Sequence, residues 1–147
     1  AVLDVLGNYR PQAIGEVQAT TGIEVEVLAD AVFQLAAFVY VSIAQDDATI
    51  ARCKPRTERL NARLVALAAT SDDIAVLASP VTGGGVGVEW IEQLFMAAIE
   101  TGCRTHEEWA AHAQKHATSW NEAELASRAR SFAGQRLPVL RALGVVS

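Results

Sequence analysis

Residues 77–90, with the sequence LASPVTGGGVGVEW, constrain the fold of this chain more than any other stretch. The apolar run over 74–78 is too short for an exposed helix and predicts a buried strand. Pro80 has no backbone N–H and therefore ends that strand. The glycines at 83–85 permit a tight turn, and residues 85–88 can return as the partner strand. The stretch therefore predicts a β-hairpin directly before a helix.

Helical patterns account for most of the chain that surrounds the hairpin. Apolar residues spaced by three and four predict one helix from residue 90 to Gly102 and another from Pro55 to about residue 69. Thr105 and Asn121 each begin a capping box, in which the side chain accepts a hydrogen bond from the first turn. Pro138 predicts a kink or a split in the last helical segment. The expected fold is mainly α with a small β-sheet, a winged-helix-like module followed by a C-terminal helical bundle.

The N-terminal third has the order of a helix-turn-helix module. The pattern predicts a short helix that ends at Gly22, an amphipathic helix over 24–37 and a strand over 38–43. A polar connector is expected from Asp46 to Pro55. Short helix, tight turn, second helix and strand is the order found in winged-helix modules.

Length and composition set the class of protein. The chain has 147 residues, of which 51% are apolar and 20% charged, so we expect a folded chain rather than a disordered one. We expect a single domain over residues 1–147, with a possible subdivision into a helix-turn-helix-like part, 1–45, and a part with the hairpin and later helices, 46–147. No apolar run approaches the roughly 18 residues that span a bilayer. Cys53 and Cys103 lack the spacing of a zinc site and are expected to be reduced thiols of a cytoplasmic protein.

Acidic residues are concentrated near the N-terminal end. The first 50 residues contain one basic side chain, Arg10, and seven acidic ones, a net charge of −6. The predicted second helix carries Glu24, Glu26 and Asp30 and no basic residue. Carboxylates repel phosphate groups, so the charge argues against nucleic acid as a partner and favours packing against protein.

Arginines recur at helical spacing in and just before the helix predicted from Pro55. They are Arg52, Arg56, Arg59 and Arg63. One interpretation of this stripe is a contact for an acidic partner. The other is the solvated face that amphipathic helices commonly present to water.

No motif for catalysis or cofactor binding stands out. Val88 occupies the position of the third glycine in a dinucleotide-binding fingerprint, and no Gly-Lys-Ser/Thr follows the glycine turn. Glu108, His112 and His116 share a helical face and could hold a divalent metal, but Ala113 breaks the HExxH motif. Surface histidines are the alternative interpretation. We therefore assign no catalytic, cofactor-binding or metal-binding residue.

Two stretches resemble a known family. They are 77–102, LASPVTGGGVGVEWIEQLFMAAIETG, and 131–146, SFAGQRLPVLRALGVV. They look like the regulatory domain that follows the S-adenosylmethionine-binding domain in a family of bacterial methyltransferases, which includes rickettsial protein lysine methyltransferases that modify outer-membrane protein. The resemblance covers nearly the whole chain and is most specific over 77–88 and 132–145.

The resemblance implies a non-catalytic regulatory or substrate-positioning domain of an S-adenosylmethionine-dependent methyltransferase. Its partners would be an upstream catalytic domain in cis and a protein substrate. No membrane partner is expected, and the sequence leaves open whether the chain forms a homo-oligomer. S-adenosylmethionine would bind in the upstream Rossmann-like domain, so no cofactor is expected in this chain. Trp90, Trp109 and Trp120 are candidate interface residues, with a place in the core as the alternative.

Two other functions remain as alternatives. One is a winged-helix DNA-binding transcriptional regulator, which would bind DNA through the arginine stripe or the glycine turn. The other is a small metal-dependent enzyme with its metal at His112 and His116.

Overall fold

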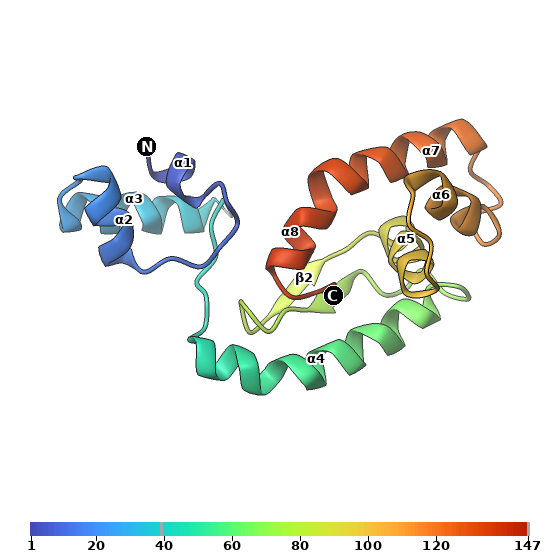
Figure 1. The fold of residues 1–147 in the computed structure, drawn as a ribbon, viewed down its shortest axis with the longest axis horizontal. Coiled ribbons are helices and arrows are strands. Elements are labelled where there is room, and N and C mark those ends of the chain that lie inside the picture. Colours follow the sequence, from blue (N-terminus) through green and yellow to red (C-terminus); the bar gives the residue numbers. More distant parts are fainter. Residues whose placement is uncertain (39, 147) are drawn as a thin grey trace. The chain divides into compact units, whose positions relative to one another are not determined.

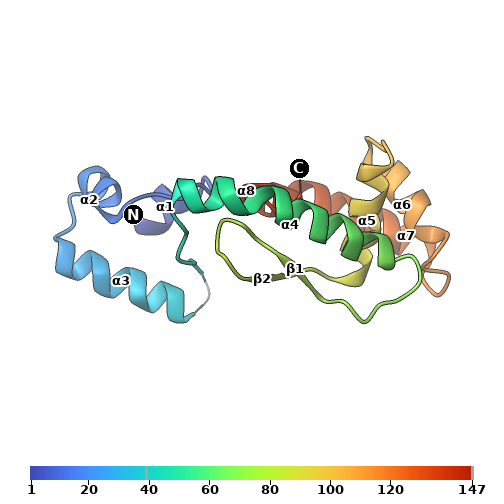
Figure 2. The ribbon, with the colours of Figure 1, turned by 90° about the horizontal axis from the view of Figure 1, so that it is seen from below.

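The computed structural model describes residues 1–38 and 40–146. These residues form a mainly helical protein with one two-stranded antiparallel sheet, as the sequence predicts (Figures 1 and 2). The chain divides into two compact units, with the boundary between Gln45 and Asp46.

The first unit contains three helices, α1 (Val2–Leu6), α2 (Ile14–Thr21) and α3 (Val25–Ala37). Gly22 ends α2 in the left-handed conformation, with φ of 68°, and its N–H donates to the carbonyl of Gln18. This is the turn that the sequence predicts between the two helices. Val17 and Leu28 are the only fully buried apolar side chains among the described residues of this unit.

The strand predicted over 38–43 is wrong for the residues that the structure describes. Phe38 lies in a turn, and residues 40–43 form a bend and irregular chain, while Val39 lies outside the described residues. A strand needs a partner for its backbone hydrogen bonds, and the described part of this unit holds no other extended segment. The β-branched and aromatic side chains that suggested a strand are instead exposed, with Phe38 at 73% and Ile43 at 85%.

The second unit begins with the long helix α4 (Asp47–Leu67), so the predicted polar connector is also wrong. The Asp46 carboxylate accepts the backbone N–H of Thr49 at 2.9 Å, which caps the helix eight residues earlier than expected. The helix passes through Pro55 at the loss of one backbone hydrogen bond. Its buried face is formed by Asn61, Val65 and Ala68, the last just beyond the helix end. Leu60 and Leu67 belong to the apolar spacing that predicts this helix, but they are 49% and 45% exposed.

The hairpin and the later helices follow the sequence pattern closely. β1 (Val76–Ala78) pairs with β2 (Gly85–Gly87), and Leu77 stands opposite Val86. The helices are α5 (Trp90–Glu100), α6 (His106–Gln114), α7 (Glu122–Ser131) and α8 (Leu137–Ala142). The predicted capping boxes of Thr105 and Asn121 are both present. The hairpin belongs to the second unit, where β1 packs against α4, and the winged-helix-like module stays a prediction.

The last helical segment, where Pro138 predicts a kink or a split, runs as helix without a break from residue 122 to residue 142. A short π-helix, η1 (Phe132–Arg136), joins α7 to α8, and the N–H of Leu137 donates to the carbonyl of Phe132, five residues back. Pro138 then lies in the first turn of α8. The helix therefore changes its winding directly before the proline.

A single apolar core holds the second unit together. Phe95, Leu94, Leu125 and Leu140 are among its fully buried side chains, and they come from α5, α7 and α8. Helix α6 packs against both α5 and α7. Gln93 is buried in the same core and donates to the carbonyls of Ile74 and Val88, which lie just before and just after the hairpin.

The C-terminal turn is fastened to the hairpin by a glycine that tolerates no side chain. Gly144 has φ of 67°, and a Cβ at this position would lie 2.8 Å from Cγ of Pro80. We expect Gly144→Ala to lower the free energy of unfolding by about 1–3 kcal/mol. The left-handed backbone strains an alanine, and its Cβ would overlap with Pro80. Urea unfolding followed by tryptophan fluorescence measures this loss.

Gly134→Ala is the matched control for that variant. A Cβ at Gly134 meets no atom within 4 Å, and its φ lies outside the left-handed region. Alanine there is expected to leave stability unchanged or raise it by about 0.5 kcal/mol. Equal losses in the two variants would contradict the account of Gly144.

Candidate functional site

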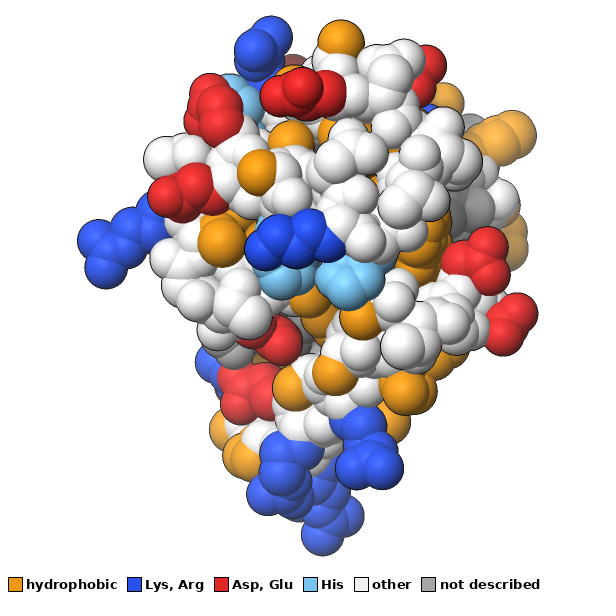
Figure 3. Space-filling view, turned by 90° about the vertical axis from the view of Figure 1, so that its right-hand side faces the viewer, with side chains coloured by type: hydrophobic (Ala, Val, Ile, Leu, Met, Phe, Trp, Pro, Cys, Tyr) orange, Lys and Arg blue, Asp and Glu red, His pale blue; other side chains and the backbone are white. Residues whose placement is uncertain are grey.

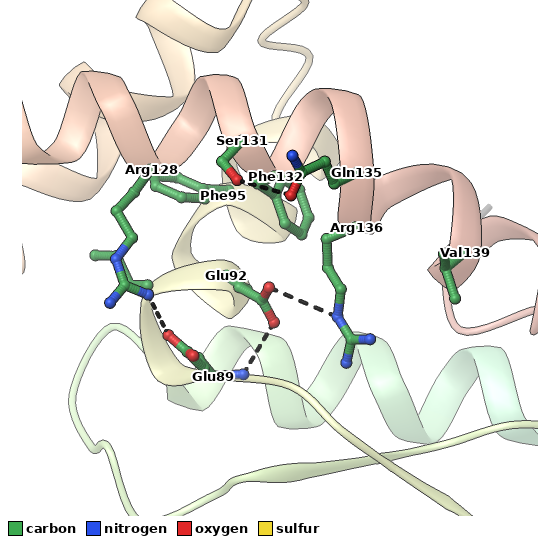
Figure 4. Close-up of a pocket in the computed structure, with 10 residues that line it drawn as sticks. Glu89, Glu92, Phe95, Arg128, Ser131, Phe132, Gln135, Arg136 and Val139 are labelled. Atoms are coloured by element: carbon green, nitrogen blue, oxygen red, sulfur yellow. Dashed lines mark hydrogen bonds and ion pairs between the residues drawn. The ribbon is translucent and has the colours of Figure 1, made fainter. Parts of the chain in front are cut away.

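A groove of about 310 Å³ lies beside the start of α5 (Figure 4). One wall is the first turn of α5 with Glu89 and Glu92. The other wall is the end of α7, η1 and the start of α8. Arg128, Ser131 and Gln135 are on this second wall, so side chains from residues far apart in sequence meet across the groove.

Aromatic side chains form the floor. The rings of Phe95 and Phe132 lie 5.6 Å apart between centroids, and Trp109 meets the Phe132 ring edge-on at 6.1 Å. All three side chains are buried. The floor is therefore a rigid part of the core, which fixes the positions of the polar groups above it.

Two pairs of opposite charges cross the groove. Glu89 pairs with Arg128, with 2.5 Å between Oε2 and Nη1, and Glu92 faces Arg136 with 3.6 Å between Oε1 and Nε. Arg128 also lies over the ring of Trp120, 5.2 Å from its centroid. Figure 4 shows the two pairs side by side, with the phenylalanine rings next to them.

Local structure holds each of these charges in place. Glu89 is the N-cap residue of α5, and the Glu92 carboxylate accepts its backbone N–H at 3.1 Å. Arg136 ends the π-helix and also donates to the carbonyl of Gly87 at the end of β2. π-Helical turns often occur at functional sites, and here the turn supplies residues of the groove wall. The charged side chains are thus set by secondary structure rather than by loops.

Burial raises the pKa of Glu92 above its ordinary value of 4.5, although its hydrogen bond from Glu89 and the charge of Arg136 act in the opposite direction. The folded state therefore binds this proton more tightly than the unfolded state does. The contribution of Glu92 to stability is present below pH 4.5 and is lost as pH rises through the raised pKa.

This sign gives a testable pH dependence. Glutamine at position 92 is neutral at every pH and keeps an oxygen that can accept the Glu89 N–H. We expect the free energy of unfolding of Glu92→Gln, measured relative to the native chain, to increase between pH 4 and pH 7. Urea unfolding at a series of pH values measures the difference. A difference that stays constant or falls over this range would contradict the raised pKa.

The predicted arginine stripe is exposed. Arg52, Arg56, Arg59 and Arg63 all lie on the surface of α4. Figure 3 shows Lys and Arg side chains gathered along its lower edge, where α4 lies. Arg52 donates to the hydroxyl of Thr49 at 3.2 Å, a contact that leaves its charge uncompensated. The stripe is separate from the groove, which α4 does not line.

The three tryptophans take part in the packing of the second unit. Trp109 is buried, and its indole N–H donates to the carbonyl of Cys103. Trp90 is half-buried and donates to the carbonyl of Ala68 at 2.7 Å. Trp120 is half-buried beneath Arg128. Trp90 and Trp120 therefore keep part of their surface for a partner, and their interface role stays a prediction.

The candidate metal ligands are engaged elsewhere or lie apart. Glu108 accepts the backbone N–H groups of Arg104 and Thr105 in the capping box. The rings of His112 and His116 are 5.8 Å apart, and His116 contacts the carbonyl of Ala69. Burial lowers the pKa of His112, as do the nearby positive charges. Within residues 1–38 and 40–146, no three His, Cys, Asp or Glu side chains gather as a metal site would require.

Sequence reasoning missed the groove, although its residues lie within or beside the two stretches that carry the family resemblance. Glu92 and Arg136 are separated by 44 residues and look like ordinary surface charges. Two sequence features lie close to the groove. They are the aromatic residues Phe95 and Phe132 and the proline at position 138 within a helical pattern. Neither feature shows that the two charged segments face each other.

Comparison of the chain with family models, curated proteins and solved structures finds no match. The resemblance to methyltransferase regulatory domains therefore rests on the two stretches alone. In the structure these stretches pack together, since the Ser79 hydroxyl donates to the carbonyl of Leu143 at 2.7 Å and Gly144 lies against Pro80. Among the described residues, no helix has the length and apolarity to cross a bilayer.

Proposed function

We propose that this chain is a non-catalytic regulatory or substrate-positioning domain of a cytoplasmic S-adenosylmethionine-dependent methyltransferase. The groove beside α5 would receive a segment of the protein substrate or of an upstream catalytic domain. The observation that carries the proposal is the arrangement of two charge pairs above a buried aromatic floor.

The groove has the chemistry of a binding surface. Each carboxylate already faces a guanidinium, so a bound segment can exchange partners with Glu89 and Arg128 without leaving a charge unpaired. Both of these side chains are about half exposed or more, which keeps the exchange accessible. The phenylalanine rings below them are buried and hold the two walls in place. A peptide with one basic and one acidic side chain fits this pattern.

The experiment uses the methyltransferase that contains this segment. Arg128→Glu places like charges opposite each other in the groove, and Arg141→Glu makes the same change at an exposed site outside it. We expect Arg128→Glu to raise the KM for the protein substrate, or to reduce assembly with the catalytic domain, by about tenfold, while the Kd for S-adenosylmethionine stays unchanged. Unchanged transfer of labelled methyl groups after deletion of residues 46–147 would overturn the proposal.

The charge of the first unit argues against the alternative of a DNA-binding regulator. Glu24, Glu26 and Asp30 are all exposed on or at the start of α3, the helix that would enter the major groove. We expect fluorescence anisotropy of labelled mixed-sequence duplex DNA to stay flat as the chain is added at low salt, because these carboxylates repel phosphates. A salt-sensitive rise that Arg59→Glu abolishes would favour the regulator instead.

A further inference from the structure

The first unit has several large apolar side chains that are exposed to solvent and few that are buried. Phe33, on α3, is 77% exposed. The side chains of Phe38, Tyr40 and Ile43, which follow α3, are each at least 71% exposed. Only Val17 and Leu28 are fully buried among the described residues of this unit. Exposed large apolar side chains on one segment are candidates for contact with a partner.

An acidic and apolar stripe runs along α3. Glu26, Asp30, Phe33 and Ala37 are spaced by four, three and four residues, so they lie on one side of the helix, and all four are exposed. The stripe covers 11 residue steps, or about 16 Å of helix. It combines two carboxylates with one large aromatic ring.

A basic and apolar stripe of the same spacing runs along α4. Arg52, Arg56, Arg59 and Arg63 are also spaced by four, three and four residues. Leu60 and Leu67, exposed at 49% and 45%, lie beside them on the same face. This stripe therefore has the same length as the first one, the opposite charge and its own apolar contacts.

We propose that α3 of one copy of this chain packs against α4 of a second copy. Carboxylates of α3 would pair with arginines of α4, while Phe33 contacts the exposed leucines. Two copies related by a twofold axis would make this contact twice, because each copy supplies both helices. Pairing of α3 with α3 would instead bring like charges together. This inference does not depend on the proposed methyltransferase role.

Charge reversal tests the proposal. One variant carries Glu26→Arg and Asp30→Arg, and the other carries Arg59→Glu and Arg63→Glu. Each variant alone would set like charges against each other in a self-pair. Mixed in equal amounts, the two variants restore opposite charges at both contacts, since each supplies one native and one reversed helix. Rescue on mixing requires contact between different copies.

Sedimentation velocity at low salt and about 100 µM protein measures the assembly. We expect the native chain to dimerise, each variant to weaken dimerisation at least tenfold, and the mixture to recover it. Arg104→Glu with Arg130→Glu reverses two exposed arginines outside α4 and is expected to leave the dimer intact. Circular dichroism verifies that every variant is folded.

Two results would overturn the inference. A native chain that sediments as a monomer under these conditions would show that α3 and α4 of different copies do not pack together. A dimer that is equally strong in all variants shows that the contact lies elsewhere. Failure of either kind leaves the groove and its proposed role unaffected, because the groove residues are not changed.

Discussion

Phe95→Ala is expected to lower the free energy of unfolding of the second unit by about 3–5 kcal/mol. The Phe95 side chain is fully buried, and its ring packs against Phe132 at the centre of the core. Alanine removes the apolar contact and leaves a cavity that the packed helices can fill only in part. Because Phe132 in turn contacts Trp109, the loss extends from α5 to α6 and η1.

Urea unfolding followed by tryptophan fluorescence measures this effect directly, since Trp90, Trp109 and Trp120 all lie in the second unit. Val76→Ala is the control, because it shortens an apolar side chain of the same unit at a position that is 53% exposed. The control is expected to change stability by less than about 0.5 kcal/mol. A small effect of Phe95→Ala would show that the core is not organised around α5.

Asn61→Ala is expected to cost about 3 kcal/mol, which is large for a polar residue. The Asn61 side chain is buried on α4 and bonds to both backbone groups of Ala78, accepting its N–H at 2.9 Å and donating to its carbonyl at 2.8 Å. It also donates to the carbonyl of Val145 at 3.2 Å. Alanine leaves these part-buried and buried backbone groups without the side chain that pairs with them. The connection that α4 makes to both the hairpin and the C-terminal turn is then lost.

Two further variants isolate the hydrogen bonds of Asn61. Asn61→Asp has nearly the same shape and still accepts the Ala78 N–H, but its second oxygen faces two carbonyl oxygens. The free energy of unfolding of this variant is expected to fall as pH rises, because the two carbonyl oxygens repel the ionised carboxylate. Arg63→Ala, on the exposed side of α4, serves as the control and is expected to have little effect. An aspartate variant as stable as the native chain would show that the amide group is not required.

The sequence predicts most of the second unit because local signals there agree with the packing. Thr105 and Asn121 cap their helices as expected, and Pro138 lies just after the π-helical turn of the last helix. The glycine turn and Pro80 define the hairpin before any tertiary contact is known. These features depend on the backbone preferences of single residues, which the sequence displays directly.

The errors arise where tertiary contacts outweigh local pattern. Asn61 lies on the buried face of α4, where its amide group donates to the carbonyls of Ala78 and Val145. Apolar spacing alone predicts that Leu60 and Leu67 are buried instead. The run after α3 has β-forming residues but no partner strand within the described part of its unit. The groove depends on Glu92 and Arg136 meeting across two helices, a contact between distant segments that single-sequence patterns do not contain.

The structure also gives a physical meaning to the two stretches on which the resemblance rests. Ser79 accepts the N–H groups of Val81 and Thr82 and donates to Leu143, which joins the hairpin turn to the end of α8. Gly144 allows the chain to pass close to Pro80. These residues of the two stretches therefore build a scaffold that joins the hairpin to the C-terminal turn.

The most direct test of the proposed function is to read the gene sequence upstream of the codon for Ala1. Our account predicts a continuous reading frame that encodes a Rossmann-like domain with a glycine-rich cofactor fingerprint, and a full-length product that binds S-adenosylmethionine. A start codon immediately before Ala1 would remove the catalytic partner on which the proposal depends and would contradict it.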